Sequence, residues 1–106
     1  MKFDILLAIA ETLEERKQAD PDKSYTAKLF HDGLDSILKK IGEEATEVII
    51  ASKSGEKEAI IHEIADLWFH IMVLLKHHGY ELKDVIQELE RRFGTSGIEE
   101  KTNRTK

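Results

Sequence analysis

The 106-residue sequence contains no cysteine, and this absence removes several classes of function. A disulfide scaffold, a cysteine nucleophile and a cysteine-ligated zinc or iron–sulfur site are all excluded. Only one proline is present, Pro21, so little in the sequence interrupts helices. No apolar stretch approaches the roughly 20 residues that a membrane-spanning helix needs. The first ten residues include Asp4 and lack a basic region followed by a long apolar one, so we expect no signal peptide.

Positive charge is also in short supply. The sequence has 16 Lys and Arg residues against 21 Asp and Glu residues, which gives a formal net charge of −5. An acidic chain is a poor non-specific binder of nucleic acid, so we predict neither a nucleic-acid nor a membrane partner. The length and the balance of charged and hydrophobic residues are typical of one globular domain. We therefore expect a single domain over residues 1–106, located in the cytoplasm.

Helical periodicity dominates the sequence, and no alternation typical of strands is present. Helices are predicted over residues 3–17, 25–31, 34–53, 56–78 and 82–93. Gly33, Gly55 and Gly79 separate the later ones, because glycine commonly ends a helix. The fold class is therefore all-α. The short connection at Gly55 predicts an antiparallel hairpin of two long central helices. Residues 95–106 form a polar, basic C-terminal segment.

The helix predicted over 56–78 is apolar around nearly its whole circumference. Ile60, Ile64 and Leu67 lie on one side of it, and Trp68 and Phe69 extend onto the other. Such a helix must be covered on most faces. We predict a homodimer in which paired hairpins build a helical bundle. The alternative is that the first and last helices cover this helix within one chain.

Two pairs of acidic residues interrupt the apolar pattern of the hairpin. Glu44 and Glu47 lie 11 and 8 residues before Gly55, and Glu63 and Asp66 lie 8 and 11 residues after it. In an antiparallel hairpin with a rise of about 1.5 Å per residue, the two pairs should reach the same height. The sequence therefore predicts that four carboxylates converge.

Four converging anions are unstable without a cation, because desolvation and like-charge repulsion both oppose them. Oxygen ligands favour a hard divalent cation, so we predict Mg²⁺, with Mn²⁺ as the alternative. Such a site suggests hydrolysis of a phosphate ester or anhydride. No glycine-rich Walker loop is present, so the chain is not a P-loop enzyme. The competing interpretation is that the acids form solvated rows paired with nearby lysines.

The spacing of Glu44, Glu47, Glu63 and Asp66 resembles the ExxE…ExxD signature of the MazG-type, all-α nucleotide pyrophosphatases. The runs SYT at 24–26, KIGEEA at 40–45, ADLWFH at 65–70 and SGIEEK at 96–101 resemble the phosphoribosyl-ATP pyrophosphatase family. The resemblance implies hydrolysis of the α–β phosphoanhydride of phosphoribosyl-ATP to phosphoribosyl-AMP and pyrophosphate, the second step of histidine biosynthesis. It also implies a stand-alone enzyme that works beside a separate phosphoribosyl-AMP cyclohydrolase.

The resemblance assigns roles to particular residues. Glu44, Glu47, Glu63 and Asp66 would hold Mg²⁺, and either Glu43 or Glu47 would take the proton of the attacking water. Other polar and basic residues are candidate substrate contacts: Lys40, Ser24, Tyr25, His70, Arg92, Lys101 and Arg104. The last three would belong to a basic segment that folds over the site.

Three of these candidates also have a structural interpretation. Ser24 is an expected helix N-cap, Tyr25 a core ring with a wet hydroxyl, and His70 a hydrogen-bonded core residue that supports Asp66. His62 is interpreted as a structural or surface residue.

Two further functions stay open. A house-cleaning pyrophosphatase would act on ordinary or damaged nucleotides, and a non-catalytic dimerisation module would carry inert acids.

Overall fold

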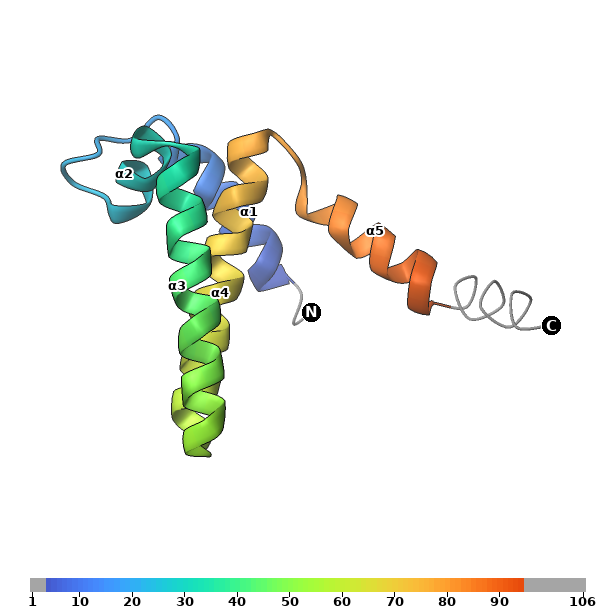
Figure 1. Cartoon of the computed structure of the whole chain (residues 1–106). Helices are drawn as coiled ribbons and strands as arrows, with labels where there is room; N and C mark the ends of the chain where they lie inside the picture. Colours follow the sequence, from blue (N-terminus) through green and yellow to red (C-terminus); the bar gives the residue numbers. More distant parts are fainter. Residues whose placement is uncertain (1–3, 95–106) are drawn as a thin grey trace.

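The computed structural model describes residues 4–94 and contains, within that range, five helices and no strand (Figure 1). The helices are α1 (Asp4–Arg16), α2 (Tyr25–Asp32), α3 (Leu34–Ser54), α4 (Lys57–His78) and α5 (Leu82–Phe93). The all-α prediction is confirmed. Every predicted helix end that falls within the described residues agrees to within one residue. The predicted C-terminal segment, residues 95–106, lies outside the described residues.

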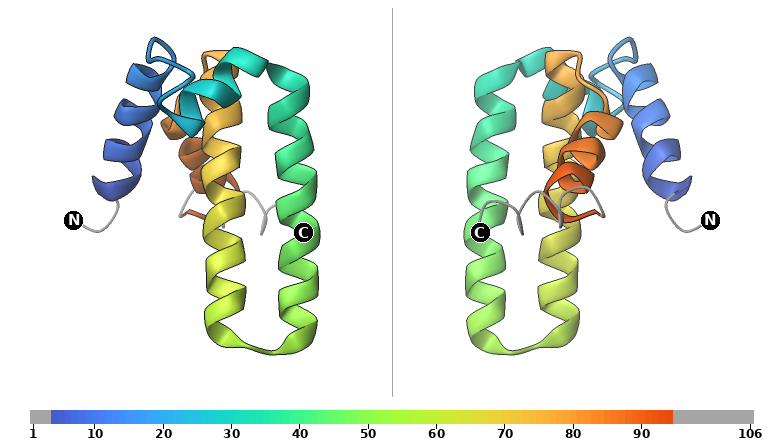
Figure 2. Two further views of the ribbon diagram at one scale, coloured as in Figure 1. Left: turned by 90° about the vertical axis from the view of Figure 1, so that its left-hand side faces the viewer. Right: turned by 90° about the vertical axis from the view of Figure 1, so that its right-hand side faces the viewer.

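The two long helices α3 and α4 form the predicted antiparallel hairpin, and Figure 2 shows them side by side and joined at one end. Gly55 makes the connection in the left-handed conformation, with φ of 79°, and its amide donates to the carbonyl oxygen of Ala51 at 3.2 Å. A side chain at this φ would strain the backbone, which explains why glycine ends α3 here. Among residues 4–94, most of the packing between helices is that of α3 against α4.

The N-terminal helices pack against the open end of this hairpin. Ser24 caps α2 as predicted, because its Oγ accepts a hydrogen bond from the amide of Ala27 at 3.1 Å. The core lies where α1, α2, α3 and α4 meet. Its buried side chains are Ala10, Leu13, Leu29, Ile37, Met72 and Val73. This core fixes how α1 and α2 lie against the upper half of the hairpin.

Helix α5 turns away from the hairpin beyond Leu82 (Figure 1). A capping box between Glu81 and Asp84 fixes its start. Its apolar face, which includes Leu89 and Phe93, stays exposed, and so does Trp68 on α4. The alternative in which the last helix covers the hairpin within one chain therefore has no support here.

No helix among residues 4–94 combines the length and the apolar character that crossing a membrane would require.

Candidate active site

The hairpin brings carboxylates of both long helices together, as its geometry predicts. Glu44 and Glu47 of α3 and Glu63 of α4 each offer one oxygen, and these oxygens lie within 4.8 Å of one another. Glu47 and Glu63 are each eight residues from Gly55 and therefore reach the same height in an antiparallel hairpin, and Glu44 lies about one turn before Glu47 on the same helix. The group is therefore compact enough to coordinate a single ion.

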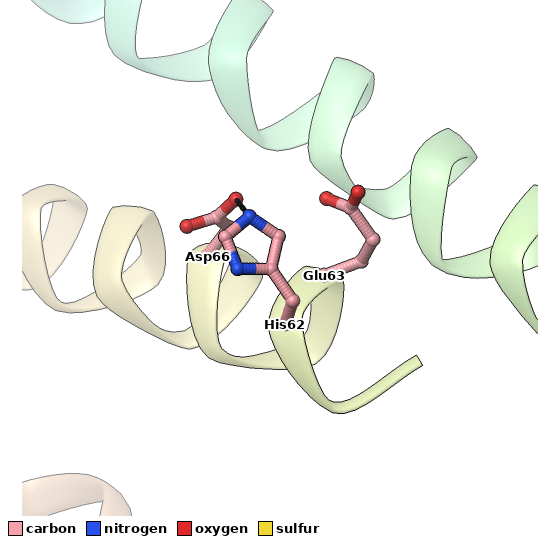
Figure 3. A group of neighbouring side chains, drawn as sticks. All are labelled: His62, Glu63 and Asp66. Atoms are coloured by element: carbon pink, nitrogen blue, oxygen red, sulfur yellow. Dashed lines mark ion pairs between the residues drawn. The ribbon is translucent and has the colours of Figure 1, made fainter. Parts of the chain in front are cut away.

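Asp66 lies in a second group rather than in the first. Its carboxylate, that of Glu63 and a ring nitrogen of His62 also lie within 4.8 Å of one another. Figure 3 shows the Glu63 carboxylate directed toward α3, while the His62 ring lies against Asp66. Glu63 belongs to both groups, so it links them. The four acids and His62 form two triads that share Glu63, and not the single cluster that the sequence predicts.

His62 is the residue of this site that the sequence interpretation missed. Its Nε2 lies 3.4 Å from Oδ2 of Asp66, although the side chain is largely exposed. The signal was present, because residues four apart on a helix are neighbours on its surface. The imidazole adds a nitrogen donor to an otherwise oxygen-only set.

Two carboxylate oxygens at the site are buried without a hydrogen-bond partner. Glu44 is only 6% exposed, and its Oε2 makes no hydrogen bond; Oε1 of Glu63 is buried and unpaired in the same way. A buried polar atom without a partner is costly, and a buried anion more so. A cation among these oxygens would remove the cost. The donor set therefore fits a hard divalent ion.

Lys40 provides the nearest positive charge. Its Nζ lies 3.4 Å from Oε1 of Glu44 and 3.6 Å from Oε1 of Glu43. Desolvation lowers the pKa of Lys40, but Tyr25, Glu44 and Glu43 outweigh that effect, and the pKa ends above its ordinary value. Lys40 is therefore a fixed positive charge at neutral pH.

A hydrogen-bond chain joins α2 to α4 next to the acids. Nδ1 of the buried His70 lies 2.7 Å from the carbonyl oxygen of Asp66, and its Nε2 lies 3.0 Å from the hydroxyl of Tyr25. A carbonyl only accepts, so Nδ1 carries the proton, and Nε2 of the neutral ring accepts from Tyr25. His70 thus holds the backbone of Asp66, not its carboxylate. Tyr25 is 55% exposed and is not a core ring.

The remaining candidates are placed differently. Glu43 is exposed and contacts only Lys40 at this site, outside both triads. Arg92 lies on α5, where its Nε bonds to Oε2 of Glu88 at 2.7 Å, so the chain does not bring it to the acids. Lys101 and Arg104 lie outside the described residues.

Fold and site together define an all-α protein with a carboxylate centre that could bind a metal ion. Comparison with known proteins narrows this class. The chain belongs to the phosphoribosyl-ATP pyrophosphohydrolase family, whose model matches residues 6–93.

Curated relatives agree with this assignment. A phosphoribosyl-ATP pyrophosphatase of Nitrosospira multiformis is 59% identical over 101 residues, covering 95% of this chain and 84% of its own. Those of Methylococcus capsulatus and Geobacter sulfurreducens are also 59% identical. They cover 96% and 95% of this chain and 97% and 94% of their own lengths.

Proposed function

We propose that this protein hydrolyses phosphoribosyl-ATP to phosphoribosyl-AMP and pyrophosphate, the second step of histidine biosynthesis, at the carboxylate centre of the α3–α4 hairpin. One observation carries the assignment of the site. Carboxylates of Glu44, Glu47 and Glu63 meet within 4.8 Å and keep two buried oxygens unpaired. An enzyme of this family must manage the dense negative charge of a polyphosphate, and such a centre with a bound cation can do so.

Glu44, Glu47, Glu63 and Asp66 would hold Mg²⁺, with Mn²⁺ as the alternative and His62 as a further neighbour. When bound, the cation would neutralise charge on the phosphate oxygens and make water a better nucleophile. The protein contributes the position of the four carboxylates, which two long helices fix from opposite sides.

The other residues handle the proton and the substrate. Lys40 contacts a phosphate oxygen as a point charge beside Glu44. The oxygen of water forms a bond to phosphorus while the α–β anhydride bond breaks, and a carboxylate takes the proton. Glu43 suits this step because it is exposed and lies outside both triads; Glu47 is the second candidate base.

The Tyr25 hydroxyl donates to His70 and therefore presents lone pairs outward. It would accept a hydrogen bond from a sugar hydroxyl rather than donate one to phosphate. Ser24 positions Tyr25 through the cap of α2. Lys101, Arg104 and Arg92 stay candidate phosphate contacts in the full assembly.

We also propose that the protein acts as a homodimer in the cytoplasm and passes phosphoribosyl-AMP to a separate cyclohydrolase. The exposed apolar side chains of Ile61 and Trp68 on α4, and of Leu89 and Phe93 on α5, support the dimer. Large apolar side chains that are exposed in this way are typical of a surface that a partner covers.

The test is pyrophosphate release by the purified protein, with and without Mg²⁺, from phosphoribosyl-ATP, ATP and a panel of dNTPs. We expect Mg²⁺-dependent release from phosphoribosyl-ATP alone, reduced about 100-fold or more in Glu44→Gln and Glu63→Gln. Glu11→Gln, which neutralises an exposed carboxylate on α1, is the matched control. Release from ordinary nucleotides would instead identify a house-cleaning enzyme. Full turnover by both variants would show that the acids are not the site.

A further inference from the structure

A groove lies between α1, the start of α2 and the Phe69 ring of α4, and of its lining residues only Ser24 has been given a role above. Its volume is about 590 Å³, which is the size of a small-molecule site. Ile9 and Phe69 supply apolar surface, and Thr12 and Thr26 supply hydroxyl groups. This mixture of apolar surface and hydroxyls suits a sugar ring.

The groove is also positively charged. Arg16 of α1 and Lys23 of the α1–α2 loop line it, and among the residues that the structure describes no Asp or Glu does. Among residues 4–94, the guanidinium of Arg16 and the ammonium of Lys23 form no ion pair and no hydrogen bond. In a chain of net charge −5, two cations beside a groove that no described acid lines make the local potential positive, which favours an anion there.

The groove and the carboxylate centre share structural elements. Phe69 follows Asp66 by three residues, a rise of about 4.5 Å along α4. Ser24 and Thr26 line the groove, while Tyr25 between them bonds to His70, whose other nitrogen bonds to Asp66. One segment, residues 24–26, therefore lines the groove and is linked through His70 to the backbone of Asp66. A single substrate that extends along α4 would reach both.

We propose that this groove binds the ribose phosphate that phosphoribosyl-ATP carries and ATP lacks, with Arg16 and Lys23 contacting its phosphate. The inference rests on the proposed function. A carboxylate centre engages the polyphosphate, which every nucleoside triphosphate has, so it cannot select this substrate. Selection requires a second contact with the part that differs. Arg16 is suited to this contact because a guanidinium can bind phosphate through two parallel hydrogen bonds.

The kinetic test uses Arg16→Gln, Lys23→Gln and the double variant in the Mg²⁺-supplemented enzyme. For each single variant we expect the KM for phosphoribosyl-ATP to rise about 10-fold, more in the double variant, with kcat within about threefold of wild type. Lys28→Gln is the matched control, because Lys28 is an exposed lysine of α2 that pairs with Asp32 outside the groove. An unchanged KM in the double variant would overturn the proposal, and so would a fall in kcat alone.

A binding test separates this inference from the proposed function. Ribose 5-phosphate, ribose and inorganic phosphate are titrated into ¹⁵N-labelled protein, and amide shifts are followed by NMR. We expect ribose 5-phosphate to shift Thr12 and Thr26 in wild type and in Lys28→Gln but not in the double variant. Shifts confined to other regions would refute the groove. Equal binding of inorganic phosphate would refute recognition of the sugar. Binding at the groove without any turnover of phosphoribosyl-ATP would refute the proposed function alone.

Discussion

Glu63 is the one residue that belongs to both triads, so its replacement by glutamine should abolish cation binding while preserving the fold. A ligand that binds only the folded state stabilises it by RT ln(1 + [L]/Kd), which is about 1.4 kcal/mol at ten times Kd. In a domain of about 100 residues this corresponds to a rise in Tm of about 6–11 °C. We expect wild type to show a rise of this size on addition of Mg²⁺ and Glu63→Gln to show about 1 °C or less.

The same reasoning also predicts the relative stability of the two proteins without a cation. Glu63 stands within 4.8 Å of other carboxylate oxygens and has one buried oxygen without a partner. Removing its charge relieves repulsion, and the glutamine amide can donate to a neighbouring carboxylate. Without Mg²⁺, Glu63→Gln should therefore be as stable as wild type or more stable, by up to about 1 kcal/mol.

The assay is thermal unfolding followed by circular dichroism over a MgCl₂ series, with ionic strength balanced by KCl. Protein concentration is held constant, because the Tm of an oligomer depends on it. Glu11→Gln should keep the full Mg²⁺ response. If Glu63→Gln also keeps it, the cation does not bind at Glu63 and the centre has been assigned wrongly. If it unfolds before Mg²⁺ is added, Glu63 stabilises the fold and the argument from repulsion fails.

Three further predictions concern the rest of the chain. Tyr25→Phe leaves Nε2 of His70 without its hydrogen-bond donor. We expect it to lower the free energy of unfolding by about 1 kcal/mol in a denaturation experiment and to lower kcat/KM in steady-state kinetics. Unchanged values of both would show that Tyr25 does not belong to the site. Leu89→Glu should convert the proposed dimer to a monomer in light scattering, whereas Gln87→Glu, which adds the same charge on the polar side of α5, should not. Hydrogen bonds from Arg91 and Arg92 lower the pKa of Glu88 from 4.5 to about 2. The stabilisation of α5 by these hydrogen bonds should be complete above pH 4.5 and should be lost as the pH falls toward 2. NMR titration of the Glu88 carboxyl would detect this loss, and Glu88→Gln should abolish the pH dependence.

Helix boundaries were predictable because local chemistry sets them. Ser24 caps α2 through its own hydroxyl, and Gly55 and Gly79 end α3 and α4 with φ near 79°. None of these features depends on distant residues. The meeting of Glu47 with Glu63 was predictable for a related reason. Once the hairpin is fixed, equal separation from Gly55 and a constant rise per residue decide the height of each side chain.

The division of the acids into two triads was not predictable in this way. Glu63 and Asp66 differ by about 60° around α4, and an aspartate side chain is one methylene shorter than a glutamate. Height alone therefore does not decide whether a carboxylate reaches across to α3. Asp66 stays near its own helix, with His62, while Glu63 is directed toward α3 (Figure 3).

Contacts between segments far apart in the chain could also not be predicted from the sequence. The Tyr25–His70 bond joins residues 45 positions apart, and the groove at Arg16 depends on how α1 lies against α4. Both depend on tertiary packing, which periodicity does not encode. The sequence indicated that Tyr25 and His70 were candidates, but not that they touch.

The charge distribution of the two sites implies an order of binding. The carboxylate centre is strongly negative, and Lys40 offsets only part of that charge through Glu44 and Glu43. A polyphosphate approaching it without a cation meets like charge at short range, where repulsion is least screened. The groove at Arg16 and Lys23 attracts the same substrate from its other end. Cation and substrate should therefore each raise the affinity for the other, because each lowers the electrostatic cost that the other would meet alone.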